Sequence, residues 1–174
     1  MKYNPDLHKR RSIRLRGYNY ANSGAYFVTI CLNQRISSKT LLYNPNINFD
    51  FPIFGIIENN TVVLNDIGKI IQQIWNEMPE HFKDIETGEF IVMPDHIHGI
   101  IKIYNCVGCV TNPINNLSQI VRWFKGRTTF ECRKMNGNFK WQRNYYEHII
   151  RNEIEYLKIA KYINNNPITT IVSL

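Results

Sequence analysis

Two histidines separated by one residue, His96 and His98, are the first side chains in this sequence that could bind a metal ion. They stand at the expected start of a β-strand, and alternate residues of a strand point to the same face. Both imidazoles would therefore share one face, with Ile97 on the other. Taken alone, the pair is either part of a metal site or two hydrogen-bonded neighbours, and a metal site needs a further ligand.

The C-terminal segment contains two polar residues, Tyr162 and Asn166, that could complete such a site. An apolar stripe at helical spacing must pack on the protein body, and it consists of Tyr156, Ile159, Ala160 and Ile163. At about 100° per residue, Tyr162 and Asn166 lie one turn apart on the same border of this stripe. Both can therefore face one cleft. The structural alternative is that Tyr162 lies at the edge of the core and Asn166 caps the helix end.

The elements that would position these residues follow from hydrophobic periodicity and from turn and cap signals. We expect strands at residues 26–32, 89–93, 96–103 and 139–150, and a loop or minor hairpin over residues 33–60. One helix is capped by Asn65 or Asp66 and is ended by Pro79, and a second, with a basic face, begins at Leu117. A last helix, capped by Asn152, covers residues 152–166 and ends before Pro167.

This order of elements matches a ferredoxin-like split βαβ sandwich, an α+β fold. It predicts a four-stranded antiparallel sheet with helices on one face, followed by a C-terminal helix that carries the tyrosine. The 174 residues are long enough for one domain with a real core, so we expect residues 1–174 to form a single domain.

The net charge of +7 is concentrated at the two ends of the chain. Residues 1–16 contain six Lys or Arg and one acid, and residues 116–174 contain ten Lys or Arg and four acids. Basic ends favour a polyanion partner, although such residues can also simply solvate a surface. The candidates for phosphate contact are Arg10, Arg11, Arg14, Arg122, Lys125 and Arg127.

Five segments of the sequence together resemble one known family. They are residues 10–15 (RRSIRL), 24–30 (GAYFVTI), 93–101 (MPDHIHGII), 141–151 (WQRNYYEHIIR) and 162–167 (YINNNP). The third segment is similar to the HUH motif of single-tyrosine transposases, in which two histidines flank a hydrophobic residue. The last two resemble the C-terminal signature of the REP-associated tyrosine transposases. The resemblance covers nearly the whole chain.

The resemblance implies a function and a set of site residues. Tyr162 would be the nucleophile, and His96, His98 and Asn166 would bind a divalent cation, Mg²⁺ or Mn²⁺, of which Mn²⁺ suits imidazole better. The substrate would be single-stranded or hairpin DNA, cut and rejoined through a 5′-phosphotyrosine intermediate. Two alternatives remain: a hairpin-binding module that has lost cleavage, and a nickase of the replication-initiator or relaxase type.

Other residues compete for these roles. Tyr145 and Tyr146 are rival nucleophiles, but strand alternation sends them to opposite faces, and we assign Tyr145, with Arg151, to DNA contact. Cys106 and Cys109 lack the second pair of ligands that a zinc site requires.

The composition indicates the setting of the protein. No apolar run approaches the roughly 18 to 20 residues that span a bilayer, and the four cysteines have no disulfide-framework spacing. We therefore expect a cytoplasmic protein without membrane contact. The sequence leaves monomer and homodimer open.

Overall fold

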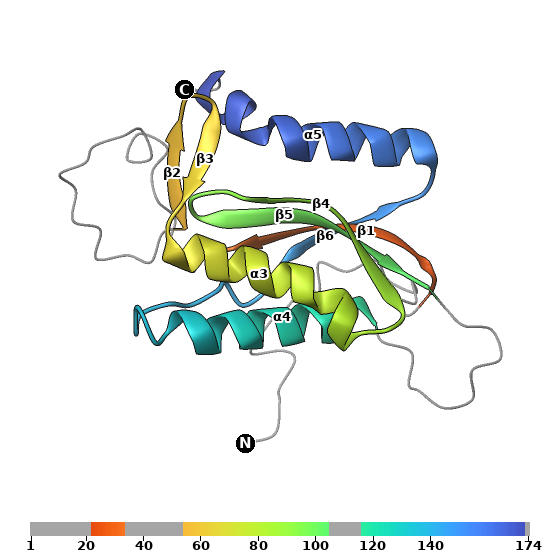
Figure 1. Cartoon of the computed structure of the whole chain (residues 1–174). Helices are drawn as coiled ribbons and strands as arrows, with labels where there is room; N and C mark the ends of the chain where they lie inside the picture. The colour runs from red at the N-terminus through yellow and green to blue at the C-terminus, as the bar shows by residue number, and fades with distance from the viewer. Residues whose placement is uncertain (1–21, 34–53, 105–115, 173–174) are drawn as a thin grey trace, which may run out of the picture.

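A four-stranded antiparallel sheet in the order β4-β5-β1-β6 is the centre of the fold (Figure 1). The computed structural model describes residues 22–33, 54–104 and 116–172, with side chains up to residue 166. The strands of the sheet are β1 (Gly24–Cys31), β4 (Ile85–Val92), β5 (His96–Ile103) and β6 (Tyr146–Ile150). The order of strands and helices along the chain and the antiparallel pairing confirm the predicted ferredoxin-like α+β class.

A separate two-stranded hairpin precedes the first helix. It consists of β2 (Gly55–Glu58) and β3 (Thr61–Leu64). Asn59 and Asn60 form its turn with φ values of 49° and 63°, as a two-residue type I′ turn requires. The hairpin therefore occupies the last part of the segment predicted as a loop or minor hairpin, and it extends four residues beyond the end of that segment.

Two helices cover one face of the sheet, α3 (Asp66–His81) and α4 (Leu117–Cys132) (Figure 1). α3 begins after Asn65, whose side chain accepts a hydrogen bond from the Gly68 N–H. α4 begins after Asn116, which forms a capping box with Gln119. The caps satisfy backbone N–H groups that the first helical turn leaves without partners, and they confirm both predicted starts.

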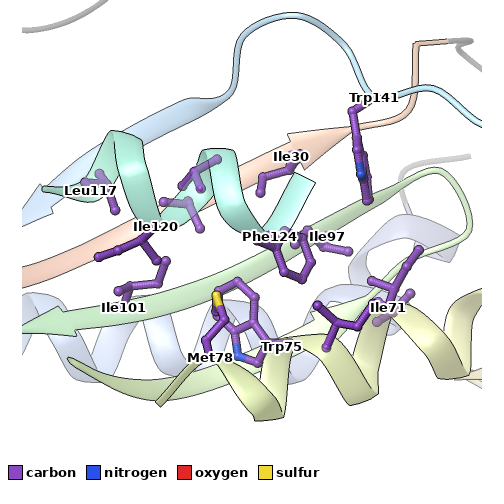
Figure 2. Packing of buried hydrophobic residues seen from close by; sticks show 14 of the residues in the cluster. Ile30, Ile71, Trp75, Met78, Ile97, Ile101, Leu117, Ile120, Phe124 and Trp141 are labelled. Carbon is purple, nitrogen blue, oxygen red and sulfur yellow. The ribbon is translucent and has the colours of Figure 1, made fainter. Parts of the chain in front are cut away.

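The large hydrophobic core lies between these two helices and the sheet (Figure 2). Alternate residues of the two central strands point into it: Tyr26, Val28 and Ile30 from β1, and Ile97, Ile101 and Ile103 from β5. From the helices, Trp75 meets Phe124 edge to face at 5.6 Å between ring centroids. Trp75 also stacks on Phe90 of β4 at 4.3 Å. The residues between the core residues of β1 and β5 consequently face the other side of the sheet.

Gly99 on β5 gives a direct test of this packing. An alanine Cβ at this position would lie 2.4 Å from two ring carbons of Trp75, a ring that is buried and stacked on Phe90. We expect Gly99→Ala to lower the free energy of unfolding by about 3 kcal/mol, measured by chemical denaturation. Gly126→Ala on α4 is the control, since nothing lies within 4 Å of its Cβ and alanine favours a helix. If Gly99→Ala and Gly126→Ala had the same free energy of unfolding, the close packing of Trp75 on position 99 would be contradicted.

The last helix, α5 (Glu153–Val172), lies on the opposite face of the sheet (Figure 1). A small cluster holds it there, formed by Phe27 of β1, Ile100 of β5, Ile150 of β6 and Ile163 of α5. The predicted cap is confirmed, because the Asn152 side chain accepts a hydrogen bond from the Glu155 N–H. The face that bears His96 and His98 is therefore the face covered by α5.

Both predicted helix ends at prolines are wrong. α3 continues past Pro79 to His81, and α5 continues past Pro167 to Val172. A residue before proline is only biased away from the helical region, and tertiary packing can outweigh that bias. In α3 the preceding residue, Met78, is fully buried in the core. In α5 the preceding residue, Asn166, is buried as well.

Three predicted strands have different bounds in the structure, and for β1 the difference is only two residues at its start and one at its end. β4 begins at Ile85, four residues before the predicted start, and a bulge interrupts the alternation of its residues: Gly88 and Glu89 stand between the pairs Thr87–Ile101 and Phe90–Gly99. The extra residue returns Phe90 to the core face.

The strand predicted at residues 139–150 is limited to Tyr146–Ile150, with one isolated bridge between Leu32 and Trp141. In the segment before this strand, the backbone carbonyls of residues 142, 143 and 144 accept hydrogen bonds from the Lys125 ammonium.

Candidate active site

His96 and His98 lie on the α5 face of β5, as their spacing predicts, and Ile97 between them is buried in the large core. His98 is paired in register with Thr29 of β1 and is only 6% exposed. His96 is partly exposed at the beginning of the strand. One imidazole is therefore fixed under α5, and its neighbour faces the open end of the same surface.

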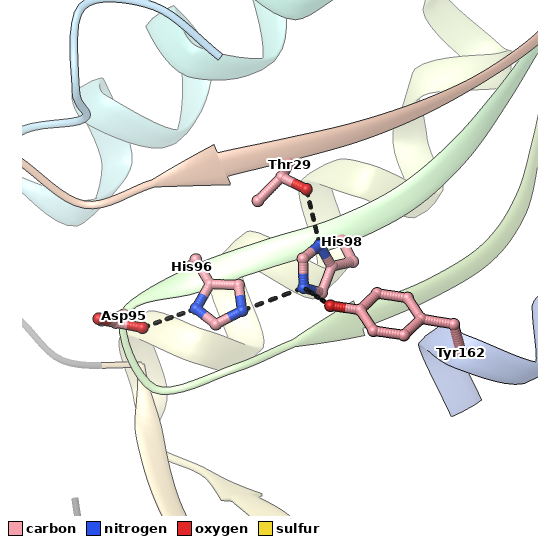
Figure 3. Close-up of polar contacts among 5 residues, drawn as sticks. All are labelled: Thr29, Asp95, His96, His98 and Tyr162. Atoms are coloured by element: carbon pink, nitrogen blue, oxygen red, sulfur yellow. Dashed lines mark hydrogen bonds and ion pairs between the residues drawn. The ribbon is translucent and has the colours of Figure 1, made fainter. Parts of the chain in front are cut away.

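Hydrogen bonds orient both rings (Figure 3). The His96 Nδ1 lies 2.6 Å from the Asp95 carboxylate, and the His98 Nδ1 lies 2.8 Å from the Thr29 hydroxyl. A carboxylate can only accept, so His96 donates through Nδ1, and its Nε2 is the ring nitrogen that faces His98. The two Nε2 atoms face each other at 3.1 Å.

The protonation state of His98 follows from its burial. Burial, followed by the nearby His96, lowers the pKa of His98 to about 3, although Asp95 acts in the opposite direction. The ring is therefore neutral near pH 7, and neutral imidazole is the form that binds metal ions.

This donor arrangement fits a divalent cation. Two imidazole nitrogens that each lie about 2.1 Å from one cation are about 3.0 Å apart when their two bonds to the cation form a right angle. The observed separation of 3.1 Å is close to that value, and it is also a hydrogen-bond distance between the two rings, which is the alternative that the sequence left open. Metal-bound histidines also usually have their other ring nitrogen fixed by a carboxylate or another oxygen, as Asp95 and Thr29 do here.

Tyr162 reaches the same point from α5. Its hydroxyl oxygen lies 3.4 Å from the His98 Nε2, and its side chain is 47% exposed (Figure 3). The structure thus brings together three of the four predicted site residues. The hydroxyl is accessible from solvent and next to the paired nitrogens, as an attacking group would have to be.

Phe27 forms a common wall for these rings and was missed by the sequence analysis. It stacks on His98 at 5.4 Å, and it meets the edges of Tyr162 at 6.1 Å and Tyr146 at 6.3 Å. Thr29 was missed as well. Strand alternation places both residues on the α5 face, but their contact with the histidines depends on the register between β1 and β5.

Asn166, the fourth predicted residue, lies one helical turn after Tyr162 and is 4% exposed. Its role as a cation ligand remains a prediction. Across residues 22–33, 54–104 and 116–172, no group of three or more His, Cys, Asp or Glu side chains is placed to hold a metal. The predicted third ligand is the amide oxygen of Asn166, a type of oxygen ligand that divalent cations accept.

α5 is tied to both edge strands of the sheet by adjacent residues. On one side, Tyr156 donates to the Glu89 carboxylate of β4 at 2.7 Å. On the other side, Glu155 contacts His148 of β6 at 2.7 Å. Burial and the hydrogen bond to Glu89 raise the pKa of Tyr156 to about 12, which keeps its hydroxyl protonated. These contacts fix the helix less than two turns before Tyr162.

Removing the Tyr156 hydroxyl tests this tie. We expect Tyr156→Phe to lower the free energy of unfolding by about 1 to 2 kcal/mol, because a hydrogen bond to a charged group is lost. If Tyr162 is the nucleophile that the resemblance implies, formation of its adduct with DNA should slow, since α5 holds it less firmly, while DNA affinity stays unchanged. Tyr104→Phe is the comparison variant, because Tyr104 donates to a different β4 carboxylate, Glu86, at the same distance of 2.7 Å. Equal slowing in both variants would refute a positioning role.

Comparison with known proteins places this site in a family. A sequence model described as "Transposase IS200 like" matches residues 53–166, which include both histidines, Tyr162 and Asn166. This chain belongs to the IS200-like transposase family. The membership confirms the single-tyrosine transposase resemblance seen in the sequence.

Two relatives and one solved structure are similar to this IS200-like transposase. An uncharacterized protein of Haemophilus influenzae is 42% identical, with 96% of this chain and 93% of that protein covered. A second protein of that organism, named "Putative REP-associated tyrosine transposase", is 24% identical, with 86% and 73% covered. A REP-associated tyrosine transposase solved bound to a REP hairpin is 21% identical with a TM-score of 0.60, covering 91% of this chain and 74% of that chain. The last comparison confirms the fold.

The predicted DNA-contact residues of this transposase lie in different surroundings. Arg122 and Tyr145 line one hollow beside α4. The Lys125 ammonium also lies there, but donates to three backbone carbonyls, and burial lowers its pKa. Arg127 pairs with Glu131 at 3.0 Å.

The remaining candidates lie elsewhere. Arg151 is exposed just before α5. Arg10, Arg11 and Arg14, with the basic segment 1–16, fall outside the described residues, as do Cys106 and Cys109. DNA contact by any of these residues therefore remains a prediction. Over the described part of the transposase, no helix is both long and apolar enough to cross a bilayer.

Proposed function

We propose that this transposase cuts and rejoins single-stranded DNA, with Tyr162 as the nucleophile. The observation that carries the proposal is the position of the Tyr162 hydroxyl, 3.4 Å from the His98 Nε2 and beside the point where the two imidazoles meet. Family membership supports DNA cleavage as the class of reaction. A divalent cation, Mg²⁺ or Mn²⁺, would be held by His96, His98 and Asn166.

The residues of the chain suit transesterification. A bound cation would polarise the scissile phosphate and offset its developing charge. The Tyr162 oxygen forms a bond to phosphorus, the bond from phosphorus to the 3′ oxygen breaks, the phenolic proton passes to solvent, and the 3′ oxygen takes up a proton. The product is a 5′-phosphotyrosine and a free 3′-hydroxyl. Because the link is still a phosphodiester, a 3′-hydroxyl can attack it and rejoin DNA without ATP.

The proposed substrate is single-stranded DNA that carries a hairpin. The positive charge of residues 116–174 supports a polyanion partner. The solved structural neighbour was bound to a REP hairpin, which gives the first DNA to test.

The test is a search for a covalent adduct. The protein is incubated with Mn²⁺ and labelled single strands that carry palindromic hairpins, and the products are separated under denaturing conditions. We expect an adduct that is lost in EDTA and whose DNA-linked peptide contains Tyr162. Metal-independent hairpin binding without any adduct would instead favour a binding module that has lost cleavage.

A further inference from the structure

A hollow of about 270 Å³ lies beside α4, on the opposite side of the sheet from Tyr162. It is lined by Ser118, Val121, Arg122, Lys125, Arg143 and Tyr145. Three of these six residues are basic and none is acidic. The hollow therefore offers an anion a concentrated positive charge next to an aromatic ring.

The wall of the hollow is held in place by Lys125. Its ammonium donates to the carbonyls of Gln142, Arg143 and Asn144 at 2.5, 3.2 and 3.4 Å. This anchor fixes the backbone from which the side chains of Arg143 and Tyr145 project. The charge of Lys125 thus organises the site, and contact with a ligand falls to its neighbours.

Two exposed arginines stand at the rim, Arg122 on α4 and Arg143 on the anchored segment. Among the residues that the structure describes, no carboxylate forms an ion pair with either guanidinium. A guanidinium suits phosphate, because it offers several N–H donors in a planar fork. Arg122 and Arg143 are therefore placed to bind a phosphate group.

Tyr145 connects this hollow with the catalytic face. It packs against the large core, whereas the next residue, Tyr146, points to the α5 face and meets Phe27, the wall of the Tyr162 site. Tyr145 directly precedes β6, an edge strand of the sheet, and Tyr146 is its first residue. A strand of DNA can therefore pass around this edge from one tyrosine to the other, over a path on the order of 10 Å.

We propose that the hollow binds a nucleotide of the single strand that flanks the scissile phosphate. Its base lies on the ring of Tyr145 and its phosphate between Arg122 and Arg143. Aromatic stacking is available to every base, so this contact holds the strand without selecting its sequence. The inference rests on the proposed function, because it takes the cut strand to lie over Tyr162 and Tyr146.

Binding measurements with an uncleavable complex test the inference. Tyr162→Phe protein is titrated, by fluorescence anisotropy, into a labelled hairpin with a single-stranded flank of about ten nucleotides on its 5′ side, on its 3′ side, or on neither. We expect Arg122→Ala with Arg143→Ala to weaken binding of one flanked hairpin on the order of tenfold. The slope of log affinity against log salt should fall by roughly one. The hairpin without a flank should bind as before.

Substitutions of Tyr145 separate stacking from structure. Tyr145→Leu should also weaken binding of the flanked hairpin on the order of tenfold, whereas Tyr145→Phe keeps the ring and should bind normally. Lys134→Ala removes an exposed positive charge outside the hollow, one paired with Glu131, and is the charge control. Equal losses with and without the flank, or no loss at all, would overturn the inference.

The two proposals fail separately. If no wild-type adduct forms but the variants still lose affinity for the flank, cleavage by Tyr162 is refuted and the nucleotide site stands. If the adduct forms on Tyr162 and the variants bind every flank normally, the site is refuted and cleavage stands.

Discussion

Replacement of Tyr162 by phenylalanine is expected to reduce the covalent protein–DNA adduct by at least about a thousand-fold, because the atom that would bond to phosphorus is removed. The ring contacts with Phe27 and His98 can remain, since they do not need the hydroxyl. Hairpin affinity and thermal stability should therefore be close to those of the wild type. A denaturing gel with labelled DNA measures the adduct, and anisotropy measures binding.

Tyr146→Phe is the matched control for this substitution. Tyr146 is exposed to a similar degree, 56%, and its ring also meets Phe27, but from β6 instead of α5. The adduct should persist in this variant. If it persisted in Tyr162→Phe and disappeared in Tyr146→Phe, the nucleophile would be on β6 and the proposed role of α5 would be wrong.

Replacement of His98 by alanine should abolish the proposed metal site. One of the two converging nitrogens is lost, and we expect the affinity for Mn²⁺ to fall by more than about a hundred-fold, with the adduct falling in parallel. Electron paramagnetic resonance of free Mn²⁺ measures the affinity. Because His98 is buried, thermal unfolding must show that the variant is folded.

Thr29→Val provides a graded comparison. Valine keeps the shape of threonine but removes the oxygen 2.8 Å from the His98 Nδ1, so the ring remains and its orientation is less fixed. Loss of such an outer contact usually lowers metal affinity by about 10- to 100-fold, less than loss of the ligand. If His98→Ala bound Mn²⁺ like the wild type and still lost the adduct, His98 would not be a metal ligand.

The parts of the site that the sequence predicts are those set by local geometry. His96 and His98 share a face because strand residues alternate, and the caps of α3 and α5 follow from Asn65 and Asn152. The helical phase of α5 places Tyr162 at the border of its buried stripe, where the structure has it. For Asn166 the phase predicts a border position, and the structure shows a buried one.

The parts that the sequence does not predict depend on long-range register. Thr29 meets His98 only because β1 pairs with β5 in one particular alignment. Glu89 reaches Tyr156 from a strand whose bulge alters the alternation that a sequence pattern relies on. Pro167 predicts a helix end that the structure does not have, because the local effect of the proline is weaker than the tertiary packing of the helix before it.

Phe27 makes the positions of this site interdependent in evolution and in engineering. One ring touches the buried imidazole of His98, the proposed nucleophile Tyr162 and the edge-strand residue Tyr146. Residues that share a contact rarely have additive mutational effects. A substitution of Tyr146 can therefore be tolerated when residue 27 is phenylalanine and be harmful when residue 27 is smaller. Libraries that vary these positions together will find combinations that single-site scans miss.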